Sequence, residues 1–121
     1  MGETENMVMD EKQASLVMGE ACAKFFRGLG DPTRLMIVEL LLDGEKNVSE
    51  LVKLIGSPQG RISSHLSCLK WCGYVNSRSE GRYIYYYIAD ERVKTILELA
   101  HEMVYQNAES ILACRVIKNR C

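Results

Sequence analysis

Apolar residues in the first third of the chain repeat at the spacing of an α-helix. Between residues 11 and 29 they recur every three or four positions, as on one face of a helix, which predicts a first helix there. The tripeptide Gly30-Asp31-Pro32 interrupts this pattern. Because Asp31 can cap a helix and proline suits a first helical position, we expect a second helix over residues 33–42.

The middle of the chain predicts two helices separated by a short turn. Asn47 or Ser49 can cap the first of them, a short helix. Ser57 as cap and Pro58 at the first helical position open the second, which is longer. A short helix, a turn and a second helix form a helix-turn-helix unit, predicted here over residues 47–72.

Two strands and a long helix are predicted next. Residues 74–78 and 83–88 are rich in tyrosine, valine and isoleucine, which favour strands, and Gly81 suits the turn between them. This hairpin would be the wing, over residues 74–88. The last helix is expected over residues 90–115 or beyond, and its apolar stripe is long enough to pack against a partner helix.

These elements predict a mainly α-helical fold with a β-hairpin, a winged helix-turn-helix that works as a dimer. The length of 121 residues suits one domain, residues 1–121, with a polar, flexible segment over residues 1–10. Residues 90–115 would be the C-terminal dimerisation helix.

Charge is distributed unevenly along the chain. The formal net charge is only −1, but the segment from Lys46 to Arg82 holds six basic residues and two acidic ones. A locally basic face of this kind can contact the phosphates that dominate DNA affinity.

Several classes of protein are disfavoured by the sequence. No run approaches the roughly 20 apolar residues of a membrane span, and no secretory signal is visible, so we expect a cytoplasmic protein without a membrane partner. The chain has two histidines, no nucleotide-binding loop and no supported Ser/His/Asp pattern, which disfavours an enzyme. No organic cofactor is expected.

The longer helix of the helix-turn-helix and the hairpin carry the residues expected to contact DNA. A recognition helix reads base edges from its N-terminal part, and phosphate contacts fix its register. The polar residues in that part are Gln59, Arg61, Ser63, Ser64 and His65. The hairpin arginines Arg78 and Arg82 are placed for a backbone or minor-groove contact.

Three segments together resemble the ArsR/SmtB family of metal-responsive repressors. LGDPTRLMIVELL is similar to that family's second helix, QGRISSHLSCLKWCGYV to its recognition helix entering the wing, and EGRYIYYYI to the returning strand. The resemblance implies a homodimer that binds double-stranded operator DNA and represses transcription. Within the family, HLSCLKWCG is most similar to cadmium/lead-sensing members that carry two recognition-helix cysteines and a third from the other subunit. By position, Cys68, Cys72 and Cys114 match those ligands.

The chemistry of the cysteines agrees with such a site. Five cysteines in a reducing compartment disfavour a fully paired disulfide framework. Cys68 and Cys72 lie four residues apart, so they share one helix face and can grip a soft metal ion together. Cd, Pb or Zn is the expected effector, and three sulfur ligands suit Cd or Pb better than structural zinc.

The other candidate ligands have simpler interpretations. Cys22 is expected to be a core thiol, and His101 a surface or interface histidine. Cys121, the last residue, is open to several roles. Because the tail around Cys114 is helix-like, that thiol can be fixed on a helix, and the sequence does not settle which subunit would supply it.

Two other functions share this fold. One is a repressor that responds to thiol oxidation or persulfides, which would need a reactive, accessible thiol. The other is a winged-helix regulator whose cysteines are only structural. In the metal hypothesis, the bound metal ties the recognition helix to the partner's last helix. The two recognition helices of the dimer then no longer fit the two half-sites of the operator.

Overall fold

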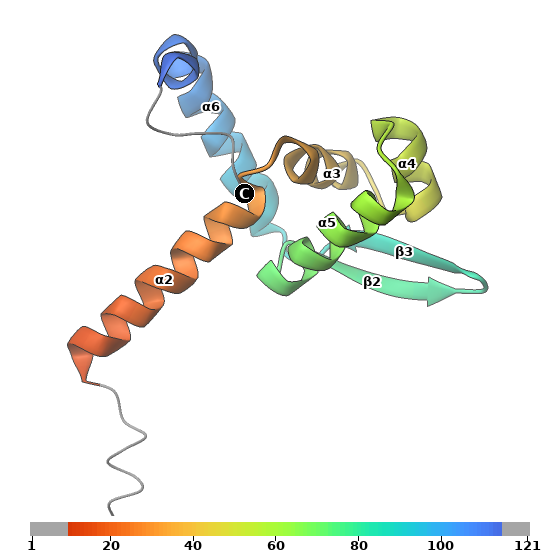
Figure 1. Cartoon of the computed structure of the whole chain (residues 1–121), viewed down its shortest axis with the longest axis horizontal. Coiled ribbons are helices and arrows are strands. Elements are labelled where there is room, and N and C mark those ends of the chain that lie inside the picture. Colours follow the sequence, from red (N-terminus) through yellow and green to blue (C-terminus); the bar gives the residue numbers. More distant parts are fainter. Residues whose placement is uncertain (1–9, 115–121) are drawn as a thin grey trace, which may run out of the picture.

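The computed structural model describes residues 10–114 and contains seven elements longer than two residues (Figure 1). These are α2 (Glu11–Leu29), α3 (Pro32–Leu42), α4 (Val48–Ile55), α5 (Gln59–Cys72), β2 (Val75–Glu80), β3 (Tyr83–Ile88) and α6 (Arg92–Ala113). The predicted mainly helical fold with a β-hairpin is confirmed. The expectations for residues 1–9 and for Cys121 lie outside the described residues.

Side-chain caps fix where two of the central helices begin. The Asp31 carboxylate accepts hydrogen bonds from the amides of Thr33 (2.9 Å) and Arg34 (3.0 Å), with Pro32 at the start of α3. Asn47, not Ser49, caps α4 in a capping box with Glu50.

The predicted start of α5 is off by one residue. Pro58 occupies the cap position and Gln59 is the first helical residue, so Ser57 is not the cap. The Pro58 carbonyl accepts hydrogen bonds from the amides of Arg61 and Ile62 (3.1 Å each), and no side chain caps this end of α5. The amides at the start of the recognition helix are therefore left without a capping side chain.

The sheet has a short strand that the hydrophobic pattern does not predict. β1 (Lys46–Asn47) pairs antiparallel with β3, which gives the strand order β1-β3-β2. β2 begins at Val75 and continues to Glu80, two residues farther than predicted. The wing therefore turns through Gly81, whose φ of 61° suits glycine.

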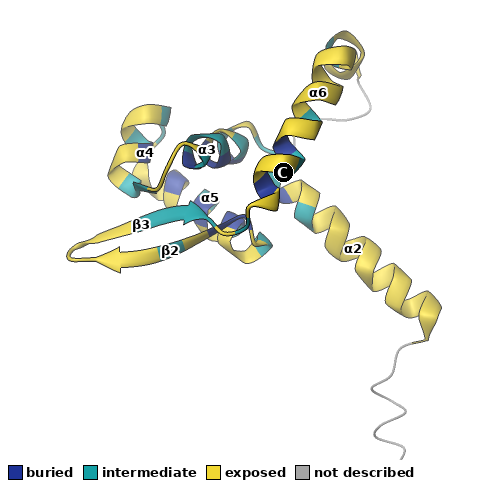
Figure 2. Ribbon diagram, turned by 180° about the vertical axis from the view of Figure 1, so that it is seen from behind, coloured by how far each residue is buried: buried dark blue, intermediate teal, exposed yellow. Residues whose placement is uncertain are grey.

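The core lies where α3, α4, α5, the sheet and the first turns of α6 meet, and we call this part the body. Buried residues gather there in Figure 2. The fully or almost fully buried apolar side chains are Ile37, Val38, Leu41, Leu51, Ile62, Leu66, Leu69, Tyr74, Val75, Val93 and Leu97. Three of them lie along one face of α5, so the recognition helix is held rigidly against the body.

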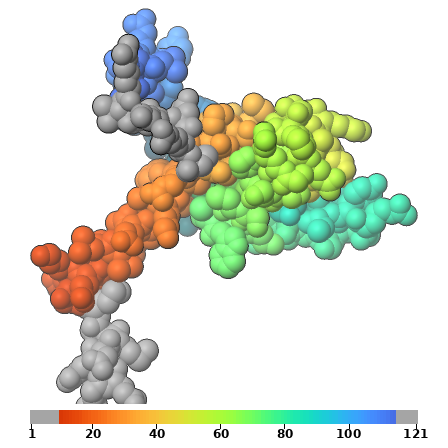
Figure 3. All heavy atoms as spheres, in the orientation of Figure 1, coloured from red at the N-terminus to blue at the C-terminus, as the bar shows by residue number. Residues whose placement is uncertain are grey.

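Two helical arms extend from the body: α2 and the part of α6 beyond Leu97 (Figures 1 and 3). Gly28 is the one buried residue of α2. Exposed apolar side chains line both arms, on α2 at Leu16, Val17, Met18 and Phe26, and on α6 at Leu99, Met103, Val104, Ile111 and Leu112. The prediction that Cys22 is a core thiol is wrong, because α2 leaves the body and Cys22 is exposed.

No helix among residues 10–114 is long and apolar enough to cross a membrane.

Candidate functional site

The exposed face of α5 carries most of the predicted DNA-contacting residues. Gln59, Arg61, Ser63 and Ser64 are all exposed in its first two turns, whereas Ile62 and Leu66 anchor the opposite face. Polar side chains on a rigid helix can enter a major groove without rearrangement. Their predicted contact with DNA stays a prediction.

His65 is directed partly into the domain. Its Nδ1 lies 3.3 Å from Nη1 of Arg34, and its Nε2 lies 3.8 Å from Oδ2 of Asp31. Because arginine only donates, a neutral His65 accepts at Nδ1 and carries its proton on Nε2, which faces the carboxylate. His65 therefore connects the recognition helix to the start of α3, and its predicted contact with DNA remains untested.

Arg34 is a buried residue at this junction that the sequence did not single out. It is 7% exposed, and its Nε donates to the carbonyl of Gly28 (2.8 Å) and its Nη2 to that of Arg27 (3.2 Å). A guanidinium at the carboxyl end of a helix satisfies carbonyls that the helix leaves unpaired. One buried cation thus joins α2, α3 and His65, and the only hint in the sequence is its position three residues after the cap Asp31.

The wing arginines differ in their surroundings. Arg78 forms a two-pronged ion pair with Glu45, at 2.9 Å from Nε to Oε2, and a longer contact of 3.3 Å with Glu80. The hydrogen bond to Glu45 raises the pKa of Arg78, and its guanidinium lies 5.0 Å from the ring centre of Tyr85. Arg82 is exposed at the tip of the hairpin. A phosphate would meet Arg82 directly but would compete with Glu45 for Arg78.

Cys68 and Cys72 form a half-buried thiol pair on the face of α5 that packs toward α2. Burial raises the pKa of Cys72, its hydrogen-bonded neighbour Cys68 raises it further, and Arg34 acts in the opposite direction. Gly28 makes this packing possible, since a Cβ there would lie 2.9 Å from Sγ of Cys72. The two sulfurs are therefore held together at the junction of α2 and α5.

An open hollow of about 340 Å³ lies over the thiol pair. Its lining residues are Lys24, Arg27 and Gly28 of α2, Arg34 of α3, and Cys68 and Cys72 of α5. The described residues lining it include three cations and no carboxylate. Trp71, 89% exposed, stands beside Cys72 on the outer face of α5.

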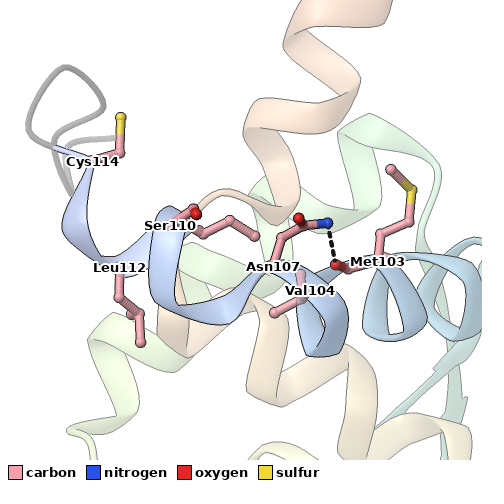
Figure 4. A pocket seen from close by; sticks show the side chains of 8 residues that line it. Met103, Val104, Asn107, Ser110, Leu112 and Cys114 are labelled. Carbon is pink, nitrogen blue, oxygen red and sulfur yellow. Dashed lines mark hydrogen bonds between the residues drawn. The ribbon is translucent and has the colours of Figure 1, made fainter.

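Cys114 caps the C-terminal end of α6, and this end of the helix lies away from α5 (Figure 1). The helix ends at Ala113, short of the predicted residue 115, because Cys114 adopts an extended conformation with ψ of 118°. A kink at Asn107 divides the helix, and the Asn107 amide donates to the carbonyl of Met103 (3.1 Å; Figure 4). Within residues 10–114, no three His, Cys, Asp or Glu side chains are arranged to hold a metal.

The end of α6 forms an apolar pocket of about 820 Å³ (Figure 4). Its lining includes Met103, Val104, Leu112 and Cys114. His101, earlier on α6, lies 2.8 Å from Glu39 of α3 through its Nε2. The exposed Cys114 is thus set in an apolar surface, whereas His101 is in hydrogen-bond contact with Glu39 of the body.

Comparisons with known proteins place these features in a family. Residues 31–77 match the family described as "Bacterial regulatory protein, arsR family". The chain is 41% identical to a probable mercury resistance operon repressor of Streptomyces lividans, over 78% of this chain and 76% of that protein. It is 40% identical to a cadmium resistance transcriptional regulatory protein, a CadC homolog of Staphylococcus aureus, over 64% of this chain and 65% of that protein.

A solved structure shares the architecture. It is a homodimeric winged helix-turn-helix DNA-binding domain of Mycobacterium bovis, described as a possible ArsR-family transcriptional regulator. The TM-score is 0.72 at 29% identity, over 86% of this chain and 94% of that one. The order of helices and the hairpin described above is therefore that of a winged helix-turn-helix.

Proposed function

This chain belongs to the ArsR family of bacterial regulatory proteins. From that premise we propose that a soft metal ion bound at Cys68 and Cys72 controls its affinity for operator DNA. The chain is a DNA-binding transcriptional regulator of the repressor type and not an enzyme. The observation that carries the proposal is the position of the thiol pair, which lies on the same rigid helix as the exposed residues predicted to contact DNA.

The donor atoms suit a soft ion. Two sulfurs on adjacent turns of one helix, with no carboxylate lining the described part of the hollow, favour Cd, Pb or Zn over Mg or Ca. When bound, the ion would supply a bridge between these thiolates and a further ligand. We propose Cys114 of a second copy as that ligand, because Cys114 of the same chain caps α6 and does not line the hollow over the pair.

A homodimer would bring the third sulfur within reach. The exposed apolar side chains of α2 and α6 form surfaces that a second copy can cover. The homodimeric state of the M. bovis domain supports this assignment. Two copies would present two α5 helices to successive half-sites of an operator.

The residues around the thiol pair offer a route from metal to DNA. Arg34 lines the hollow, acts electrostatically on Cys72 and contacts His65, one turn before Cys68. A change at the thiols would therefore alter the surroundings of Arg34 and the orientation of His65. In the proposed mechanism, tying α5 to the partner's α6 also changes the spacing of the two reading helices, and operator affinity falls.

The test is a titration of the reduced protein with Cd(II), Pb(II) and Zn(II), followed by the ultraviolet thiolate-to-metal band and by operator binding. We expect a band that saturates at one metal per protomer, is lost in Cys68→Ser and Cys72→Ser and is weakened in Cys114→Ser. Cys22→Ser is the matched control and should behave as wild type, since Cys22 lies outside the hollow.

Operator binding decides between the metal and its alternatives. Because coupling is reciprocal, metal should weaken operator binding and operator should weaken metal binding by the same factor, typically about 5–150-fold. A band without any change in operator affinity would contradict the proposal. Release of DNA by an oxidant alone would instead support a thiol-redox regulator.

A further inference from the structure

The wall opposite the thiol pair is cationic. Lys24 and Arg27 lie three residues apart on α2, and Gly28 follows at the point where α2 touches Cys72. Residues at this spacing share one helix face, so both side chains border the same side of the hollow. Arg34 provides a third positive charge, buried beneath them.

These charges exceed what the fold requires. Arg34 satisfies the carbonyls of Arg27 and Gly28 and so has a structural role. Lys24 and Arg27 are exposed, and among the described residues no acidic side chain joins them in lining the hollow. Two exposed cations beside two thiols form a surface that attracts an anion able to reach sulfur.

A soft metal in a thiol-rich compartment is itself held by thiolates. Small thiols that also carry carboxylates make such a complex anionic. Three thiolates around one divalent ion likewise give a net charge of −1, which neighbouring cations stabilise. The positive charge of the hollow therefore suits both the anionic complex that brings the metal and the anionic three-sulfur site that forms.

We propose that the hollow formed by Lys24, Arg27, Cys68 and Cys72 receives its metal as an anionic complex with a small, carboxylate-bearing thiol. The two cations bind the carboxylates and bring the metal to the sulfurs. This inference rests on the proposed function and adds the chemical form in which the metal is delivered.

The transfer is a pair of ligand exchanges. A bond forms between Sγ of Cys72 or Cys68 and the metal, and a bond from the metal to one small thiolate breaks. The departing thiolate takes the proton of the cysteine thiol and leaves as a neutral thiol group. No sulfur and no metal changes its oxidation state, and the same exchange is repeated at the second cysteine.

The experiment compares two carriers of Cd(II). Reduced apo-protein is mixed in a stopped-flow instrument with Cd(II) in excess glutathione, which carries carboxylates, or in excess 2-mercaptoethanol, which carries none. The rate at which the cadmium–thiolate band of the protein appears is measured for each carrier. The ratio of the two rates separates the effect of the carrier's carboxylates from the intrinsic reactivity of the cysteines.

Matched variants locate that effect. Lys24→Gln/Arg27→Gln removes the two exposed cations of the hollow, whereas Lys12→Gln/Lys53→Gln removes two exposed cations elsewhere and changes the net charge equally. We expect the ratio of the uptake rate from glutathione to that from 2-mercaptoethanol to fall about 10-fold in the hollow variant and to stay at the wild-type value in the control. Added salt should lower the wild-type ratio but leave the hollow variant unchanged.

The outcomes separate the two proposals. If the hollow variant keeps the wild-type ratio while the band still forms, delivery as an anionic complex is wrong and the cysteine site stands. If both double variants lower the ratio equally, the effect belongs to net charge, and the hollow is not the binding site. If Cd(II) alone gives no band at Cys68 and Cys72, the proposed function fails and this inference fails with it.

Discussion

The body and the two arms cover their apolar side chains in different ways. In the body, Ile37, Leu51, Ile62 and Leu66 are fully buried by residues of the same chain. On the arms, Met18 and Met103 are 64% and 66% exposed. The body is therefore complete within one chain, whereas the arms gain comparable burial only against another surface. Stability and assembly should accordingly respond to different substitutions.

The largest expected effect is the loss of a core side chain in the body. Leu66→Ala should lower the free energy of unfolding by about 2–5 kcal/mol, because it removes a fully buried side chain and leaves a cavity. Urea denaturation measures the change. Leu54→Ala is the matched control, since Leu54 is 57% exposed and its loss should change stability by about 0.5 kcal/mol or less. Equal effects would contradict the division between body and surface.

A charge placed on an arm should act on assembly instead. Met103→Glu should weaken self-association by at least about 10-fold, because it puts a carboxylate into the apolar surface assigned to the partner. Sedimentation velocity over a dilution series measures this constant. Ser79→Glu adds the same charge on the wing and should leave the association unchanged. A Met103→Glu protein that assembles like wild type would remove α6 from the interface.

The junction between body and arm can be tested at one atom. Gly28→Ala should destabilise the fold by about 1–3 kcal/mol, since the new Cβ would lie 2.9 Å from Sγ of Cys72 and 3.2 Å from Tyr74. Gly19→Ala, on the same helix, meets nothing within 4 Å and should stabilise it by up to about 1 kcal/mol. Thermal unfolding of both variants gives the comparison. Two changes of the same sign would show that α2 does not pack on Cys72 in this way.

The smallest expected effect concerns the start of α6. Hydrogen bonds from the side chain and backbone of Arg92 lower the pKa of Asp90 from 3.8 to about 2. A lowered carboxyl pKa adds stability above the unfolded value and loses it as pH falls through the folded one, here between about pH 4 and pH 2. Carboxyl NMR titration should place the pKa of Asp90 near 2 and move it toward 3.8 in Arg92→Gln, which removes the side-chain hydrogen bonds and keeps the backbone one. A wild-type value near 4 would rule out this contact.

Local chemistry made much of the fold predictable. Some features depend only on residues that are close in the sequence, so the sequence reveals them. They are the helix caps at Asp31 and Asn47 and the turn glycine at position 81. β1 could not be predicted in the same way, since two residues carry no periodic pattern and their pairing depends on β3. The start of α5 was misplaced by one residue because Ser57 and Pro58 are both plausible at a helix entrance.

The site was less predictable because it depends on tertiary contacts. Helical spacing was enough to pair Cys68 with Cys72, but it did not indicate that Cys22 lies on an arm. It did not reveal the burial of Arg34 either, because arginines usually lie on the surface. Its burial follows from the carbonyls that α2 presents at its end, a feature that appears only when α2 and α3 are packed.

Trp71 gives the molecule a built-in optical label. It is the single tryptophan of the chain, it is 89% exposed, and it adjoins Cys72 within the same helical turn. Indole emission responds to heavy ions and to changes in polarity nearby. Whatever arrives at the thiol pair, an ion or a segment of a second copy, should therefore change the fluorescence of the unmodified protein without any attached dye.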